Sequence, residues 1–194
     1  VINVITERGE PGATADFSLG SFRTNRIGLK LGAEVGGGNG LLSLSRFRTD
    51  GYRQHSAAIR EQANAKLAMP LPGGSSLTLV ANSFASPETQ DPLGLTRAQM
   101  NADPRQVVAN AITFDTRKSA AQQQFGAAYA SRLGGWTLNA AFYGGERTVR
   151  QYLAIPLATQ AGATHSGGVV DLGRGYGGAS MRLTRDTDLM GRPF

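Results

Sequence analysis

Apolar and polar residues alternate along most of the chain, in stretches of about ten residues separated by glycine-rich turns. In the clearest stretch, residues 26–35, one face carries Ile27, Leu29, Leu31, Ala33 and Val35. The opposite face carries Arg26, Gly28, Lys30, Gly32 and Glu34. Because the side chains of a strand point alternately to its two faces, this period of two predicts a β-strand.

Two further stretches repeat this pattern. On one face, residues 60–69 carry Arg60, Gln62, Asn64 and Lys66, and the other face is apolar except for Glu61. Residues 136–147 set Trp136, Leu138, Ala140 and Phe142 against a face that includes Asn139. The apolar face of this last stretch begins and ends in an aromatic ring.

The whole chain divides into eight expected strands that follow a short β segment over residues 1–6. The strands lie near residues 13–21, 24–35, 40–49, 57–69, 76–86, 118–132, 136–147 and 175–185. Tight glycine-containing turns are expected at 36–40, 72–75 and 134–135, because glycine adopts the positive φ that such turns need. The alternate connections, about 50–56, 87–117 and 148–174, are longer, and Thr96 is a candidate N-cap for a short helix within the second.

Strand length decides which kind of β protein this pattern favours. Strands of soluble proteins usually have about five or six residues, whereas a tilted strand that crosses a bilayer needs about nine to eleven. The best stretches have the longer value, and short turns at one end with long loops at the other are typical of outer-membrane barrels. We therefore predict an all-β fold, an antiparallel transmembrane β-barrel, with a soluble sandwich as the alternative.

The barrel interpretation assigns each strand face to an environment. The residues expected to face lipid are Ile27, Leu29, Leu31, Leu67, Leu138 and Phe142. The residues expected to face the lumen are Lys30, Arg60, Gln62, Asn64 and Asn139.

Composition narrows the possible chemistry. The chain has no cysteine, which excludes disulfides, zinc–cysteine sites and thiol catalysis. Its formal net charge of +6 suits an anionic membrane surface or an acidic small ligand. The basic residues are spread singly rather than gathered with stacking aromatics, so we expect no nucleic-acid partner.

No catalytic or metal site is predicted. Residues 173–178 fit the GxGxxG dinucleotide motif, but the residues that follow alternate as a strand instead of opening a helix. His55 and His165 lack the regularly spaced partners of a metal site, and we interpret both as solvent-exposed loop residues. We expect no enzyme activity and no cofactor.

Arginines on the long-loop side are the best candidates for ligand binding. Guanidinium groups pair bidentately with carboxylates and phosphates, so a funnel lined with them would collect anionic ligands. We predict Arg105, Arg117, Arg147 and Arg150 as the ligand contacts. The alternative is that such rim arginines pair only with lipid phosphates or with loop carboxylates.

Several segments resemble one family of outer-membrane proteins. Residues 1–6, which read VINVIT, resemble the last plug strand of TonB-dependent receptors, although Glu7 stands where a basic residue is usual. Four further segments resemble parts of the ferric-siderophore type, namely residues 49–53, 91–96, 114–119 and 168–172.

The resemblance implies a 22-stranded barrel filled by an N-terminal plug, which imports a ferric siderophore or a similar anionic chelate with energy relayed by TonB. It implies that residues 1–6 are the last strand of the plug domain and that residues 7–194 are the N-terminal part of the barrel, about eight of its strands. The expected location is the bacterial outer membrane. Two alternatives remain: a complete eight-stranded barrel that serves as an anchor or adhesin, and a soluble sandwich or enzyme.

Overall fold

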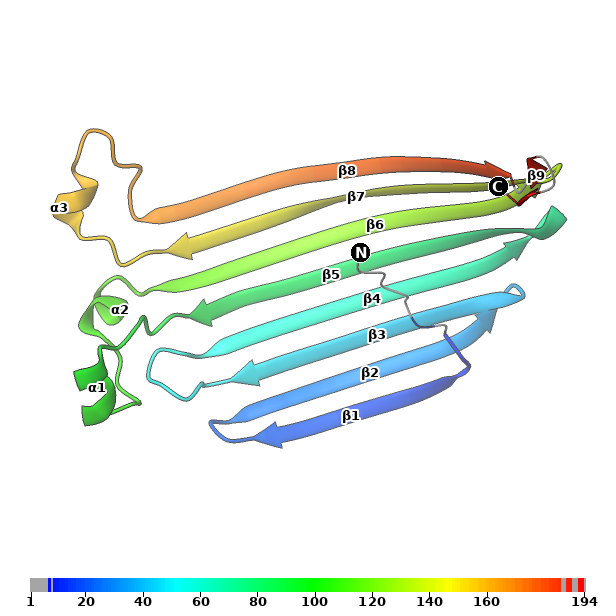
Figure 1. The fold of residues 1–194 in the computed structure, drawn as a ribbon. Helices are drawn as coiled ribbons and strands as arrows, with labels where there is room; N and C mark the ends of the chain where they lie inside the picture. The colour runs from blue at the N-terminus through cyan, green and yellow to red at the C-terminus, as the bar shows by residue number, and fades with distance from the viewer. Residues whose placement is uncertain (1–6, 8, 186–187, 190–191, 194) are drawn as a thin grey trace.

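The chain forms one antiparallel sheet of eight strands in sequential order (Figure 1). This computed structural model describes residues 7, 9–185, 188–189 and 192–193. The strands are β1 (Gly12–Gly20), β2 (Thr24–Val35), β3 (Gly38–Thr49), β4 (Ala58–Leu71), β5 (Ser75–Gln90), β6 (Arg117–Leu133), β7 (Trp136–Tyr152) and β8 (Val169–Arg185). The predicted all-β antiparallel architecture and the existence of all eight strands are confirmed.

Shorter elements connect the strands. They are η1 (Pro72–Gly74), α1 (Arg97–Ala102), α2 (Ala109–Thr113), α3 (Leu157–Gln160) and a separate two-stranded pair, β9 (Asp188–Leu189) with β10 (Arg192–Pro193). The three α-helices lie at one end of the sheet, and the tight turns between β2 and β3, β4 and β5, and β6 and β7 lie at the other (Figure 1). Thr96 is the N-cap of α1, as predicted, and its side chain accepts a hydrogen bond from the Gln99 backbone N–H at 3.2 Å.

β7 and β8 extend further toward the long-loop end of the sheet than predicted. β7 continues to Tyr152 and β8 already begins at Val169, so the loop expected over 148–174 is only 153–168. The predicted loop is wrong here: polar residues and glycines are common in loops, but pairing between β7 and β8 satisfies the backbone hydrogen bonds of these residues and keeps them in strands. The GxGxxG segment, residues 173–178, lies wholly inside β8.

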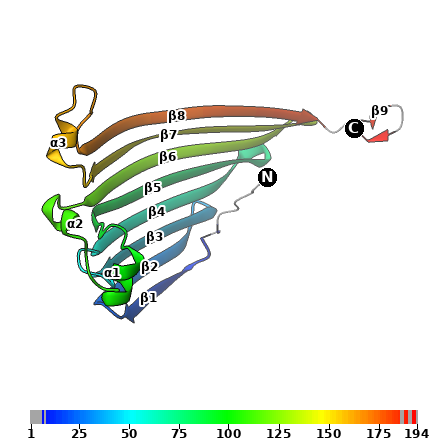
Figure 2. The same ribbon diagram turned by 60° about the vertical axis from the view of Figure 1, so that its left-hand side comes forward.

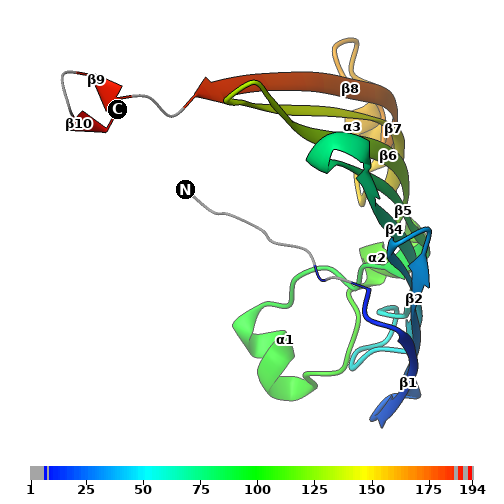
Figure 3. The ribbon, with the colours of Figure 1, turned by 90° about the vertical axis from the view of Figure 1, so that its right-hand side faces the viewer.

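The two faces of the sheet differ in polarity and in curvature. One face carries the apolar residues of the alternating pattern, such as Phe17, Phe125 and Phe142, which are 61–64% exposed. The other face is polar and is the concave one, since Glu7 and α1 lie on that side of the curved sheet (Figure 3). The predicted division of residues between two faces is confirmed by the register, which aligns Leu29 with Leu44 and Lys30 with Ser43.

No second layer covers the apolar convex face within the described part of the chain. The buried apolar residues there are only Ala58 and Ala111, so the fold lacks the inter-sheet core of a β-sandwich. Among the described residues, no helix is long and apolar enough to cross a membrane.

The sheet is open rather than closed on itself. Among the strands that the structure describes, β1 pairs only with β2, and β8 pairs only with β7. Each therefore has one edge with unpaired backbone groups, a template for pairing with further strands. The prediction of a barrel is thus shown only as far as a curved antiparallel sheet.

The chain enters β1 across the concave face. The Glu7 carboxylate accepts hydrogen bonds from Lys30 Nζ at 2.9 and 3.2 Å, and its backbone oxygen accepts one from Lys66 Nζ at 3.0 Å. A Cβ on Gly32 would lie 1.8 Å from the Glu10 backbone oxygen, so only glycine permits this close approach. Residues 1–6, the predicted plug strand, lie outside the described residues.

Candidate functional site

The loop-side half of the concave face carries four arginines from two pairs of strands, β2 with β4 and β7 with β8. Arg26 of β2 lies beside Phe47 of β3, and Phe47 lies beside Arg60 of β4, whose guanidinium lies 5.5 Å from the Phe47 ring centroid. In β7 and β8, Arg147 and Arg174 are direct cross-strand partners. We call Arg26, Arg60, Arg147 and Arg174 the arginine tier.

Neutral polar side chains lie between and beneath these arginines. One row of cross-strand partners on the concave face contains Ser45, Gln62, Phe84, Gln122, Arg147 and Arg174. The next row toward the short turns contains Asn64, Asn82, Gln124 and Tyr176, and Tyr176 donates a hydrogen bond to Gln124 Oε1 at 3.0 Å. Amides and a phenol can both donate and accept, so this surface suits a polar ligand.

The four arginines predicted from the sequence do not form a single site. Arg147 belongs to the arginine tier, but Arg150, three residues along the same strand, lies on the convex face. Arg117, at the start of β6, also lies on the convex face, where its guanidinium is 3.8 Å from the Tyr152 ring centroid and pairs with Asp115. Arg105 lies in the loop between β5 and β6.

Two of the predicted arginines already have carboxylate partners. Arg150 donates to Asp171 Oδ2 from Nε at 2.9 Å and from Nη2 at 2.7 Å, and this hydrogen bond raises the pKa of Arg150. The pair lies on the loop side of the apolar band, in an exposed position. Arg117 donates from Nη1 to the Asp115 carboxylate and to the Asp115 backbone oxygen. Their placement matches the alternative of arginines that pair with nearby carboxylates.

The loop over residues 91–116 folds toward the concave side of the sheet (Figures 2 and 3). Arg105 anchors it there: its Nε donates to the Tyr52 backbone oxygen at 3.3 Å, and its guanidinium lies 5.4 Å from the Phe22 ring centroid. Arg53 contributes more, since its guanidinium donates to the backbone oxygens of Pro92, Leu93 and Gln106 at 3.1, 2.6 and 2.9 Å. Arg53 is therefore a residue that holds the loop in place.

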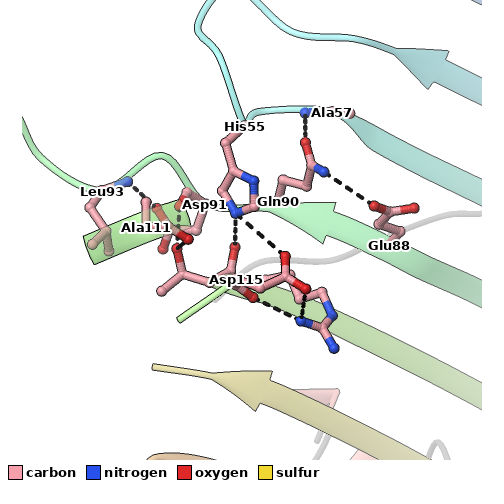
Figure 4. A network of polar contacts seen from close by, with 10 residues as sticks. His55, Ala57, Glu88, Gln90, Asp91, Leu93, Ala111 and Asp115 are labelled. Atoms are coloured by element: carbon pink, nitrogen blue, oxygen red, sulfur yellow. Dashed lines mark hydrogen bonds and ion pairs between the residues drawn. The ribbon is translucent and has the colours of Figure 1, made fainter. Parts of the chain in front are cut away.

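His55 corrects a second sequence expectation, that both histidines are exposed. Its side chain is only 9% exposed, and its Nε2 lies 2.8 Å from the Thr116 backbone oxygen and 3.8 Å from Asp115 Oδ1 (Figure 4). Thr116 is itself buried and donates to the Asp91 backbone oxygen at 2.6 Å. His165 is half-buried, and its Nδ1 accepts a hydrogen bond from the Gly167 N–H at 3.0 Å.

The described residues contain no group of three or more His, Asp or Glu side chains that could hold a metal ion. The sequence reasoning missed Arg26 and Arg174 as members of a common site. The signal was present in part, because alternation puts Arg26 on a polar strand face and Arg174 falls at the end of the expected long loop, but their positions relative to the other arginines depend on the register between strands. No model of a known protein family matches the chain.

Proposed function

We propose that this sheet is part of an outer-membrane β-barrel of the TonB-dependent receptor type, and that it helps to import a ferric siderophore or a similar small anionic chelate. The observation that carries the proposal is the pairing of an uncovered apolar convex face with a polar, basic concave face. A sheet in water would leave the apolar face exposed at a high free-energy cost, whereas lipid would cover it.

The dimensions of the apolar band support a membrane-facing role. On the convex face of β6, the band runs from Phe125 to Leu133 and is interrupted only by Ser131. Eight residue steps at about 3.3 Å span about 26 Å along the strand, or about 20 Å of height at a 40° tilt. That value approaches the outward-facing band of about 25 Å in outer-membrane barrels.

The boundaries of the band have the expected chemistry. On the loop side, two successive rows of the convex face carry polar side chains: one contains Gln123 and Glu146, and the next contains the Arg46–Glu61 ion pair at 3.3 Å. At the short-turn end, the convex face carries Trp136, the cross-strand partner of Leu133. Charged groups at one boundary and an aromatic ring at the other are what the two interfaces of a bilayer favour.

The arginine tier supports transport of an anion more than catalysis. Concave faces lined by one sign of charge raise the local concentration of oppositely charged solutes. Of the four arginines predicted from the sequence, Arg147 remains the proposed ligand contact, because it faces the concave side. The resemblance of residues 1–6 to a plug strand supports TonB as a partner, outer-membrane lipid as the surrounding medium and no cofactor.

The alternative of a complete eight-stranded anchor or adhesin requires β1 and β8 to pair. They do not pair in this sheet, so the structure favours the first candidate, in which further strands continue both edges.

Nitroxide labels on the two faces of the sheet test the membrane orientation. In lipid vesicles, labels at Leu29 and Leu67 should be accessible to oxygen dissolved in the bilayer, and labels at Lys30 and Asn64 to a water-soluble nickel chelate. Equal accessibility at positions 29 and 30 would reject the proposed orientation.

Transport is tested separately by deleting the gene. The deletion should abolish TonB-dependent uptake of the iron chelate, and unchanged uptake of all chelates offered would reject the receptor function.

A further inference from the structure

We infer that Arg147 and Arg174 form a binding point for an oxyanion, a carboxylate or phosphate group that offers oxygens to two guanidinium groups. The inference rests on the proposed function and names the chemical group that the concave face holds. Arg147 and Arg174 are direct partners across β7 and β8, and both side chains are exposed on the concave face.

Their placement is unfavourable unless an anion lies between them. Like charges directly opposite each other in a sheet destabilise it. The concave face of β6, β7 and β8 carries Lys118, Arg132, Arg147, Arg174 and Arg182, with no Asp or Glu among them. The carboxylates of these strands, Glu146 and Asp171, project from the convex face instead. The sheet therefore concentrates uncompensated positive charge on one side.

Most hydrogen-bond donors of the pair remain available to a ligand. Arg147 donates to Gln122 Oε1 at 3.3 Å, and the described part of the chain gives Arg174 no hydrogen bond or ion pair. Each guanidinium has five N–H donors in a planar fork, a geometry that matches the oxygens of a carboxylate or phosphate. Gln122 adds a neutral group beside the pair.

Arg150, on the convex face of the same strand, differs from Arg147 in having a carboxylate partner. It is bound to Asp171 Oδ2 through two hydrogen bonds, at 2.9 and 2.7 Å. Arg150 and Arg147 are three residues apart in β7, so both lie near the loops, but their side chains project from opposite faces of the sheet. Arg150 is therefore a matched control for any general effect of arginine removal.

Inorganic pyrophosphate, titrated calorimetrically into the full chain in detergent micelles, tests the inference. Arg147→Gln and Arg174→Gln should each weaken its binding about tenfold or more, the loss expected for charge-assisted hydrogen bonds. Added salt should weaken binding to the parent protein, because the site is exposed. Arg150→Gln should leave the affinity unchanged.

Stability measurements separate a binding role from a structural one. Without pyrophosphate, Arg147→Gln and Arg174→Gln should raise the midpoint of urea unfolding, because each removes a like-charge contact. Arg174→Glu should raise it as well, by placing a carboxylate opposite Arg147, and should abolish binding.

Three results would overturn the inference: absence of pyrophosphate binding to the parent protein, equal binding by all variants, or a lowered unfolding midpoint in both glutamine variants. None of these would affect the accessibility of labels at positions 29 and 67, which report on the convex face. Failure of the oxyanion site is thus distinguishable from failure of the membrane assignment.

Discussion

Adjacent alanines in β6 offer a direct measurement of which face meets lipid. Ala127 lies on the convex face, and its cross-strand partners are Leu79 and Phe142. Ala128 lies on the concave face, between Thr78 and Ala141. Replacing each by arginine introduces the same side chain, at the same depth, into two different environments.

The expected magnitude follows from the depth of Ala127 in the apolar band. On the convex face of β6, Ala127 is four residues from Gln123 and six from Leu133, about 13 and 20 Å along the strand, so it lies near the middle. An arginine at the midplane of the lipid face costs about 2–4 kcal/mol, which is about a 30- to 900-fold change in the unfolding equilibrium. In water, a surface substitution usually changes stability by no more than about 0.5 kcal/mol.

Reversible urea unfolding in lipid vesicles would measure both free energies of unfolding. We expect a loss of about 2–4 kcal/mol for Ala127→Arg and about 0.5 kcal/mol or less for Ala128→Arg. Equal losses would show that both faces meet the same medium, and a larger loss for Ala128→Arg would reverse the orientation. Either outcome would refute the reasoning from the uncovered apolar face.

Three further perturbations test other parts of the structure. Arg53→Ala should expose the loop over residues 91–116 to proteases, because three backbone oxygens lose their donor; unchanged cleavage would mean that the loop is held by other contacts. Gly32→Ala should displace the Glu10 backbone, since its Cβ would lie 1.8 Å from that oxygen, and faster amide exchange at the start of β1 would report it. The open edges of β1 and β8 should make the isolated chain associate in detergent, whereas a monodisperse, heat-modifiable monomer would favour the small-barrel alternative.

The sequence was sufficient for the existence and order of the eight strands and for the tight turns, because alternation and glycine are local signals. Residues 24–35 illustrate this, since the predicted strand has the same bounds as β2. The start of β8 at Val169 was missed because residues 173–178 are rich in glycine, and only pairing with β7 keeps them extended.

The candidate site was harder to predict, because it depends on contacts between distant residues. The alternation of side chains along β7 places Arg147 and Arg150 on opposite faces, but only the register between strands shows that Arg147 lies opposite Arg174. His55 was expected to be exposed, and its burial arises from a loop 60 residues later in the chain, which supplies Thr116 and Asp115. No local pattern carries that information. The membrane environment and the transported solute stay predictions.

In the proposed orientation, the extra length of β7 and β8 determines how far the wall of the barrel extends beyond the lipid surface. Six residues of β7 follow Glu146, the polar boundary of the convex face, before the strand ends at Tyr152. At about 3.3 Å per residue and a 40° tilt, that extension rises about 15 Å above the lipid surface. Its backbone hydrogen bonds would form in water, so this part should exchange its amide protons sooner than the lipid-embedded part. A solute would then enter a water-filled vestibule outside the membrane. It would pass Arg147 at the level of the lipid head groups before it reached the part of the barrel that the hydrocarbon core surrounds.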